Sequence, residues 1–218
     1  MRQLLLHRHK LIQITTRVKN ELQHLMLNKG IQKKAKLWTQ QGRAALMALP
    51  LQSNCSQRRQ DLLQLLGVLE HQVNRLDRAV AEAAGNFAEA RLLMTQPGIG
   101  SVTALAFVLT IGGINRFHHS RQVTSYLGLI LREFSSGGKQ KMGAISKQGN
   151  WLLRFLLVEA AGVAIRFDPE MRSEYLHRCH KKHRAVAGVA AARKLAVRLY
   201  WMLRTQTPHP QVLSSRAA

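Results

Sequence analysis

Residues 61–90 read DLLQLLGVLEHQVNRLDRAVAEAAGNFAEA, and apolar side chains recur there at steps of three and four. This spacing places them on one face of an α-helix, and its seven-residue repeat is typical of a coiled coil. At ~1.5 Å per residue the rod spans roughly 40 Å. The pattern predicts a coiled-coil helix that pairs with another helix of this chain or with a second copy, the alternative being a long helix packed inside its own domain. The seam consists of Leu62, Leu66, Leu69, Val73, Leu76, Val80, Ala83, Phe87 and Ala90.

Helical periodicity also dominates the rest of the chain, whereas the two-residue alternation of a strand is scarce. A first helix is expected from Leu4 to Leu27, with Gly30 as its stop. The run Asp168-Pro169-Glu170 is a helix start, since it combines an N-cap, a proline in the first turn and an acid near the positive dipole end. Shorter helices are predicted over residues 101–111, 120–127, 151–167, 168–181 and 184–205, and a loop over residues 135–149.

These elements predict an all-α protein, in which a long coiled-coil helix precedes a compact helical domain with a helix-hairpin-helix element. We expect a basic helical linker region in residues 1–60 and the coiled-coil helix in residues 61–93. The compact C-terminal domain is expected in residues 94–206, and a flexible tail in residues 207–218. The 218 residues are enough for one medium-sized domain or two small helical ones.

Charge is the strongest signal in the composition, because 33 Lys and Arg stand against 11 Asp and Glu, a formal net charge of +22. A globular chain this basic repels itself unless a polyanion neutralises it, so a nucleic acid is the expected partner. Two basic blocks, residues 1–60 and 98–218, flank a less basic segment. We expect no membrane association, since no apolar run reaches the ~18 residues of a membrane span. The two cysteines, Cys55 and Cys179, stand far apart and favour a reduced, cytoplasmic protein.

The run Pro97-Gly98-Ile99-Gly100 precedes the predicted helix of residues 101–111 and is typical of the hairpin of a helix-hairpin-helix element. Two glycines allow left-handed backbone angles and a close approach to a ligand. The exposed amides and the helix N-terminus would then form an anion site for a DNA phosphate. An ordinary tight turn between helices is the alternative, because Pro-Gly is a common turn pair.

A second candidate site is the loop FSSGGKQK, residues 134–141. A serine hydroxyl beside glycines, with Lys139 and Lys141 close by, suits a phosphoryl-transfer nucleophile, since glycine permits close approach and the cations stabilise transition-state charge. Taken alone, the composition fits a solvated flexible loop better.

A third candidate is the run ISKQGN, residues 145–150, which leads into Trp151 and Arg154. Ser146 or Asn150 can cap the following helix, so part of this run is structural. Lys147 and Arg154 place cations near a helix start, where acids are normally favoured, and this placement indicates a bound anion. Asn150 and Arg154 lie one turn apart and could face the same groove.

The stretch from His177 to Arg184 contains three histidines and Cys179 among four cations. Zinc needs about four converging ligands, and histidines at steps of three drift around a helix. We therefore interpret this stretch as a basic, phosphate-facing surface and predict no metal site in this chain.

The order of these motifs resembles one family, the insertion-sequence transposases that include the Piv-type DNA invertases and act as bridge-RNA-guided recombinases. The resemblance covers about residues 90–205, and extends more loosely through the first helix and the coiled coil. The motifs are Pro97-Gly98-Ile99-Gly100, Tyr126-Leu127-Gly128-Leu129, Ser135-Ser136-Gly137, Ile145-Ser146-Lys147, Gly149-Asn150, Leu153-Arg154 and Ala192-Arg193-Lys194-Leu195.

The resemblance implies a transposase in which a serine directly before glycine, here Ser136 with Ser135 as the fallback, attacks DNA and forms a phosphoserine link. It implies an N-terminal RuvC-like domain that holds Mg²⁺ through four acids, composite active sites in a homo-oligomer joined by the coiled coil, and a structured RNA that selects DNA. No cofactor is expected in this chain itself. The implied DNA contacts are Pro97, Gly98, Ile99, Gly100, Lys139, Lys141, Lys147, Asn150, Arg154, Arg193 and Lys194.

This sequence departs from the family pattern in two places. Leu131 stands where the family usually has proline, and no acidic cluster precedes the coiled coil, where Glu21 is the one acid among residues 1–60. We therefore expect that the RuvC-like domain is missing, as in a truncated reading frame. The alternative function is a non-catalytic nucleic-acid-binding remnant; a structural RNA-binding protein of ribosomal type fits less well, because of the heptad seam and the serine-glycine loop.

Overall fold

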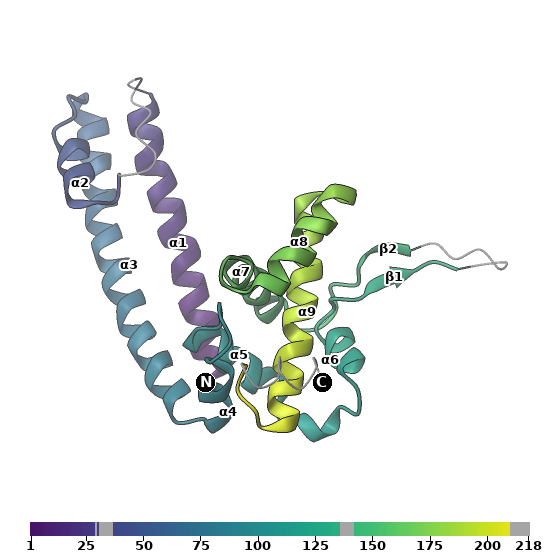
Figure 1. The fold of residues 1–218 in the computed structure, drawn as a ribbon. Helices are drawn as coiled ribbons and strands as arrows, with labels where there is room; N and C mark the ends of the chain where they lie inside the picture. Colours follow the sequence, from purple (N-terminus) through teal and green to yellow (C-terminus); the bar gives the residue numbers. More distant parts are fainter. Residues whose placement is uncertain (29, 31–36, 136–141, 210–218) are drawn as a thin grey trace. The chain divides into compact units, whose positions relative to one another are not determined.

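The computed structural model describes residues 1–28, 30, 37–135 and 142–209, and these residues form two compact units. One unit comprises Gln3–Ala79, and the other comprises Met1–Arg2 with Val80–Ala218. The described residues are mainly helical, as predicted (Figure 1). The helices are α1 (Arg2–Leu27), α2 (Gln40–Met47), α3 (Ser53–Gly85), α4 (Ala88–Leu93), α5 (Ser101–Ile111), η1 (Ile114–Arg116), α6 (Ser120–Tyr126), α7 (Trp151–Phe167), α8 (Pro169–Lys181) and α9 (Arg184–Thr205).

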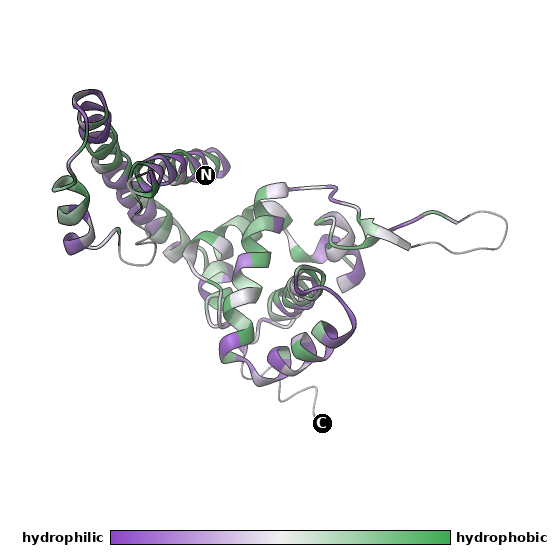
Figure 2. Cartoon of the chain, turned by 90° about the horizontal axis from the view of Figure 1, so that it is seen from above, coloured by the Kyte–Doolittle hydropathy of each residue, from purple (hydrophilic) through white to green (hydrophobic). Residues whose placement is uncertain are grey.

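The Gln3–Ala79 unit is built on α1 and α3, which run antiparallel. Two ion pairs show this direction, because the later residue of α1 bonds the earlier residue of α3: Lys19 bonds Glu70 at 3.1 Å, and Glu21 bonds Arg58 at 2.9 Å. Hydrophilic and hydrophobic residues alternate along both long helices (Figure 2), as expected of helices that bury one face.

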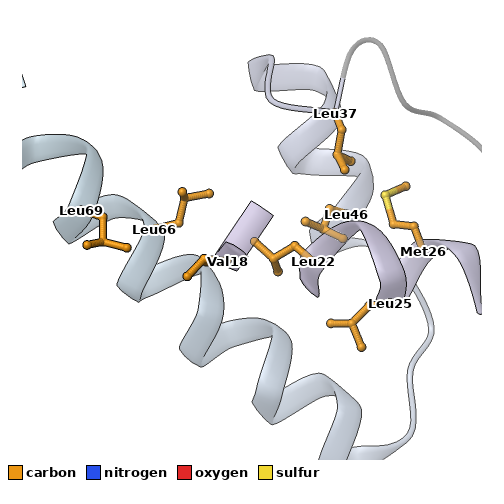
Figure 3. Packing of buried hydrophobic residues seen from close by; sticks show 8 residues of the cluster. All are labelled: Val18, Leu22, Leu25, Met26, Leu37, Leu46, Leu66 and Leu69. Atoms are coloured by element: carbon orange, nitrogen blue, oxygen red, sulfur yellow. The ribbon is translucent and has the colours of Figure 1, made fainter. Parts of the chain in front are cut away.

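Leucines from three helices form the core of this unit (Figure 3). Leu66 and Leu69 of the predicted seam are buried in it, so this part of the seam packs inside the chain. The predicted coiled-coil helix of residues 61–93 corresponds to two helices, because α3 ends at Gly85 and α4 begins at Ala88. The core residues are Val18, Leu22, Leu25, Met26, Leu37, Leu46, Leu66 and Leu69.

The second unit is assembled around α9, which contacts α4, η1, α6, α7 and α8 (Figure 1). Its buried face carries Leu195, Leu199 and Met202, none of which is exposed to solvent. Two predicted helix boundaries are confirmed here: α5 ends at Ile111, with Gly112 as its C-cap at a φ of 63°, and Asp168 caps the start of α8. None of the helices among the described residues has the length and apolar character needed to cross a membrane.

The main departure from the predicted helices is a short antiparallel ribbon of β1 (Leu131–Glu133) and β2 (Met142–Ile145). Leu131 pairs with Ile145 and Glu133 with Met142, so two steps along β1 face three along β2. This extra residue is a β-bulge, which bends a ribbon and changes where its side chains point. The prediction of a continuous loop over residues 135–149 was therefore wrong for β2.

Candidate functional site

The ribbon rests on two backbone segments that lie side by side, residues 127–130 after α6 and residues 146–150 before α7. The amide of Ser146 donates to the carbonyl of Ile130 at 2.8 Å, and the amide of Lys147 donates to the carbonyl of Gly128 at 3.2 Å. These bonds continue the antiparallel pairing below the ribbon. They fix the path by which the serine-bearing segment leaves and re-enters the helical domain.

Two glycines make this close approach possible. Gly128 has a φ of 66°, and a Cβ there would lie 2.2 Å from the carbonyl oxygen of Gln148. Gly149 has a φ of 79°, and a Cβ there would lie 2.1 Å from the carbonyl oxygen of Tyr126. Any side chain would force the segments apart, so both glycines of the recognised motifs serve this backbone-to-backbone packing.

Asn150 is the N-cap of α7, as one of the two sequence alternatives predicted. Its Oδ1 accepts from the amide of Leu153 at 3.1 Å, and its Nδ2 donates to the hydroxyl of Thr110 on α5 at 3.0 Å. Ser146 is buried, and its Oγ has no hydrogen-bond partner among the described residues. The cap therefore belongs to Asn150, which also ties the site to α5.

Arg154 lies one turn into α7 and supports both backbone segments. Its guanidinium donates to the carbonyl of Leu127 at 3.0 Å and to the carbonyl of Gln148 at 2.9 Å. Partial burial lowers the pKa of Arg154 from its ordinary value, but an arginine side chain stays charged at any physiological pH. Arg154 thus adds a fixed positive charge to the site while holding its two segments together.

The charges at the start of α7 are all positive among the described residues. The first turn contains no acid, and the exposed Lys147 precedes it in a left-handed conformation with a φ of 56°. The helix N-terminus carries a partial positive charge, so these cations add to it rather than offset it. The arrangement favours an external anion at this helix start.

Of the two candidate nucleophiles, Ser135 lies among the described residues and Ser136 lies outside them, as do Lys139 and Lys141. Ser135 is exposed, and its hydroxyl donates to a carboxylate oxygen of Glu133 at 2.5 Å. A carboxylate in this position can withdraw a proton from a serine hydroxyl. The role of Glu133 escaped sequence analysis, although its place two residues before Ser135 on a strand would have put both side chains on one face.

The hairpin motif lies between α4 and α5, and its two glycines differ in surroundings. A Cβ on Gly98 would lie 2.4 Å from the carbonyl oxygen of Ala160, so the close approach at this glycine is to helix α7. Gly100 is exposed, has open space around its Cα, and is the N-cap of α5 without a side-chain cap. Ile99 is buried and Pro97 is partly buried. The surface available to a phosphate at this motif is therefore the Gly100 side and the first amides of α5.

The last two predicted DNA contacts, Arg193 and Lys194, are neighbours on α9 with different surroundings. Arg193 is exposed, whereas Lys194 bonds Glu170 at 2.7 Å and Glu174 at 2.5 Å. The structure thus leaves Arg193 facing solvent and places Lys194 in a network with α8.

That network has a buried centre, which sequence analysis missed. Arg198 of α9, with 1 % of its side chain exposed, bonds the buried Asp168 and also Glu170. Burial alone would raise the pKa of Asp168, but the bonds from the Met171 amide and from Arg198 outweigh it and hold that pKa below 3.8. The bond from Lys194, helped by Arg198, likewise lowers the pKa of Glu170 below 4.5. Because each of its two cations bonds two carboxylates within the chain, this network stabilises the fold rather than binding a ligand.

Among the described residues, no group of three or more His, Cys, Asp or Glu side chains is placed to hold a metal ion. His177, Cys179, His180 and His183 do not converge on one point either.

The segment that carries this site, from α4 through the ribbon to α8, also matches known proteins. Residues 90–176 match the sequence profile described as the transposase IS116/IS110/IS902 family. Residues 90–176 of this chain are therefore similar to the transposase domain of that family. Over 210 residues it is 32% identical to a probable family 20 transposase of Pseudomonas aeruginosa, an alignment that covers 90% of this chain and 60% of that protein.

Two further relatives are similar to parts of the chain. The transposase for insertion sequence element IS1328 of Yersinia enterocolitica is 32% identical over 149 residues, which cover 66% of this chain and 44% of that protein. The transposase for insertion sequence element IS1111A of Coxiella burnetii is 44% identical over 70 residues, which cover 32% of this chain and 19% of that protein. The chain spans at most about three fifths of the length of these relatives.

Proposed function

We propose that this chain acts in DNA transposition by supplying a serine nucleophile and the DNA-binding surface of a strand-exchange site. The similarity of residues 90–176 to a transposase family is the observation that supports this proposal. These residues contain the hairpin motif, the ribbon and the α7 start. A positively charged surface beside a serine is the chemistry that attack on a phosphodiester needs.

In the proposed reaction, the hydroxyl oxygen of Ser136 attacks a DNA phosphorus atom. A bond from serine oxygen to phosphorus forms, one strand oxygen departs, and it leaves as a hydroxyl with the proton given up by serine. The phosphoserine link keeps the energy of the phosphodiester, so a second strand hydroxyl can attack it and release the serine. Lys147, Arg154 and the α7 dipole stabilise the extra negative charge on the phosphate during both steps.

Ser135 is the alternative nucleophile, and the bond from its hydroxyl to Glu133 is what favours it. If Ser136 reacts instead, Ser135 and Glu133 hold the preceding backbone in place. The role of the Glu133 carboxylate differs between the two cases. If Ser135 is the nucleophile, Glu133 must be ionised to accept the serine proton as a general base, whereas a purely structural Glu133 need not accept a proton.

The partners belong to the proposal as well. We propose that Mg²⁺ comes from a RuvC-like domain of a partner, that the assembly is a homo-oligomer, and that a structured RNA selects the DNA. Since Leu66 and Leu69 are buried inside the chain, an oligomer contact on α3 would use another face, where Leu65 and Val68 are exposed.

The test is a search for a DNA strand covalently attached to the protein. The chain is mixed with insertion-sequence end DNA, a structured RNA, a separately supplied RuvC-like domain and Mg²⁺, and the adduct is measured on a denaturing gel. Ser136→Ala should abolish the adduct, whereas Ser135→Ala and Glu133→Gln should spare it. Loss in Ser135→Ala and Glu133→Gln, with Ser136→Ala active, would move the nucleophile to Ser135.

A non-catalytic nucleic-acid-binding remnant is the second candidate. The intramolecular bonds of Arg154, Asn150 and Lys194 are compatible with it, because they give these three residues structural roles that do not require catalysis. The same gel separates the two functions: a remnant binds DNA, and no adduct forms under any of the conditions above.

A further inference from the structure

The end of α8, the turn after it and the start of α9 form a projecting stretch of basic residues, which we call the basic corner. Within it, every residue from 177 to 184 except Cys179 is exposed to solvent. An exposed fringe on nearly all sides of a helix end is unusual in a packed domain, because most helices bury one face along their whole length. The basic corner consists of His177, Arg178, His180, Lys181, Lys182, His183 and Arg184.

The acids near the basic corner are already engaged elsewhere. Glu170 and Glu174, the two acids of α8, both accept from Lys194 of α9, and Glu170 also accepts from Arg198. These bonds lie on the side of α8 that faces α9. The corner therefore carries a surplus of positive charge that the fold does not balance.

A stripe of the basic corner borders a hollow in the surface. Ser173, His177 and Lys181 are spaced four residues apart, so they lie above one another along α8. Together with Glu174, Arg178 and Lys182 they line a hollow of about 620 Å³. An open hollow with this basic lining suits the phosphates of a nucleic acid better than a single enclosed ligand.

The start of α9 adds to this positive potential. His183 is its N-cap, and the Nδ1 of His183 accepts from the amide of Ala185 at 3.2 Å. The first turn contains no acid, and Arg184 is its first residue. Cations at the positive end of a 22-residue helix destabilise it unless an anion is bound nearby.

We propose that the basic corner is a second DNA contact of the transposase domain, which binds the phosphate backbone of a duplex apart from the α7 start. This proposal depends on the proposed function only for the choice of DNA as the ligand, since DNA is the substrate of transposition. When a helix end enters the ~12 Å major groove of B-form DNA, its cations reach the phosphates that border the groove, whereas the narrow major groove of A-form RNA excludes side chains. Duplex DNA is therefore the better match.

The test compares two variants that remove the same charge from different places. Lys181→Gln with Lys182→Gln alters the basic corner, and Lys10→Gln with Arg17→Gln alters exposed cations of α1. Binding to a fluorescently labelled DNA duplex is measured by anisotropy over a range of salt. We expect the corner pair to weaken binding about tenfold and to reduce the log–log salt slope by about 1.8, the value for two phosphate contacts at ~0.9 each.

The α1 pair should weaken binding less than about threefold, because the proposal assigns these two cations no phosphate contact, and exposed charges beyond a Debye length of ~10 Å at 0.1 M salt are largely screened. Equal losses in both pairs, or no loss in the corner pair, would overturn the proposal. A double-stranded RNA of the same length is the second probe: a loss as large as that for DNA would overturn the assignment to duplex DNA.

A single variant, Ser173→Glu, tests the proposal independently in case the Lys181→Gln, Lys182→Gln double variant does not fold. It places a carboxylate at the hollow on an exposed helix position, so it should weaken DNA binding while circular dichroism stays unchanged. This result does not depend on the serine chemistry. Failure of the covalent adduct would disprove the proposed reaction and leave the corner standing, whereas unchanged binding in Ser173→Glu would disprove the corner alone.

Discussion

The α7 and α8 helices begin with the same cap and with opposite charge around it. Asn150 accepts from the amide of Leu153 at 3.1 Å, and Asp168 accepts from the amide of Met171 at 2.9 Å. At the start of α8, Asp168 forms an ion pair with Arg198, whereas the first turn of α7 has no acid. The positive end of α8 is therefore neutralised by acids of the chain itself. The positive end of α7 is not, and it keeps a positive potential that can attract an external anion.

The largest expected effect is on stability and concerns the ion pair at the start of α8. Arg198→Met should lower the free energy of unfolding by about 3–5 kcal/mol, because it leaves the buried Asp168 without its counter-charge. Urea denaturation measures the loss. The matched control is Arg193→Gln on the same helix, which should stay within about 0.5 kcal/mol of the wild type since Arg193 is exposed. Similar stabilities for both variants would contradict the account of the α8 start.

The two glycines of the hairpin should differ in how much each contributes to the stability of the fold. Gly98→Ala should cost about 2–4 kcal/mol, since it combines a left-handed conformation with a clash against the α7 backbone. Gly100→Ala should cost at most about 1 kcal/mol, because it only replaces glycine with a poorer N-cap. Thermal unfolding gives both values. If Gly98→Ala proves as stable as Gly100→Ala, the packing of the hairpin on α7 is misdescribed.

Acid should weaken the α8 start before other parts of the second unit. The folded-state pKa values of Asp168 and Glu170 lie below their ordinary 3.8 and 4.5. Each carboxylate therefore stabilises the fold above its ordinary pKa, and this contribution is lost as the pH falls through the folded-state pKa. We expect the free energy of unfolding to fall more steeply below pH 4.5 in the wild type than in Arg198→Met. Parallel curves would show that the network does not link folding to these protons.

The smallest effect concerns the α7 start. Asn150→Ala should cost about 1 kcal/mol through the lost cap, whereas Asn150→Asp should keep the cap and the stability. Asn150→Asp should nevertheless weaken DNA binding, because it adds a negative charge where we propose a phosphate. Urea denaturation and DNA titration, run on both variants, separate the two roles. Undiminished DNA binding in Asn150→Asp would argue against an anion at α7.

The helices could be predicted from sequence because their signals are local. Leucine spacing, the range of residues 101–111 and the Asp168-Pro169-Glu170 start each depend on signals within a few residues, and the structure confirms the last two. The ribbon could not be predicted, because all three residues of β1 are exposed and no alternation of burial marks the strand. Its pairing follows from the turn at Gly128, which packs against a segment about twenty residues later.

The site was predictable as a set of motifs and not as a set of contacts. Nothing near Arg198 in the sequence indicates a buried arginine, because its partner Asp168 is 30 residues away. The same holds for Gly98, whose neighbour Ala160 lies on another helix. Sequence analysis treated Lys194 as a DNA contact because its type and motif fitted, whereas its two glutamate partners became evident only in the folded chain.

The most direct test of the proposed reaction is to map the atom that carries the DNA. The denaturant-resistant adduct is digested with nuclease and protease, and mass spectrometry locates the nucleotide remnant on a peptide that spans the ribbon. Our account predicts a phosphodiester on Ser136 in the wild type and no remnant in Ser136→Ala. A remnant on Ser135 or on a residue outside the ribbon, or no adduct when the RuvC-like domain, RNA and Mg²⁺ are all supplied, would contradict it.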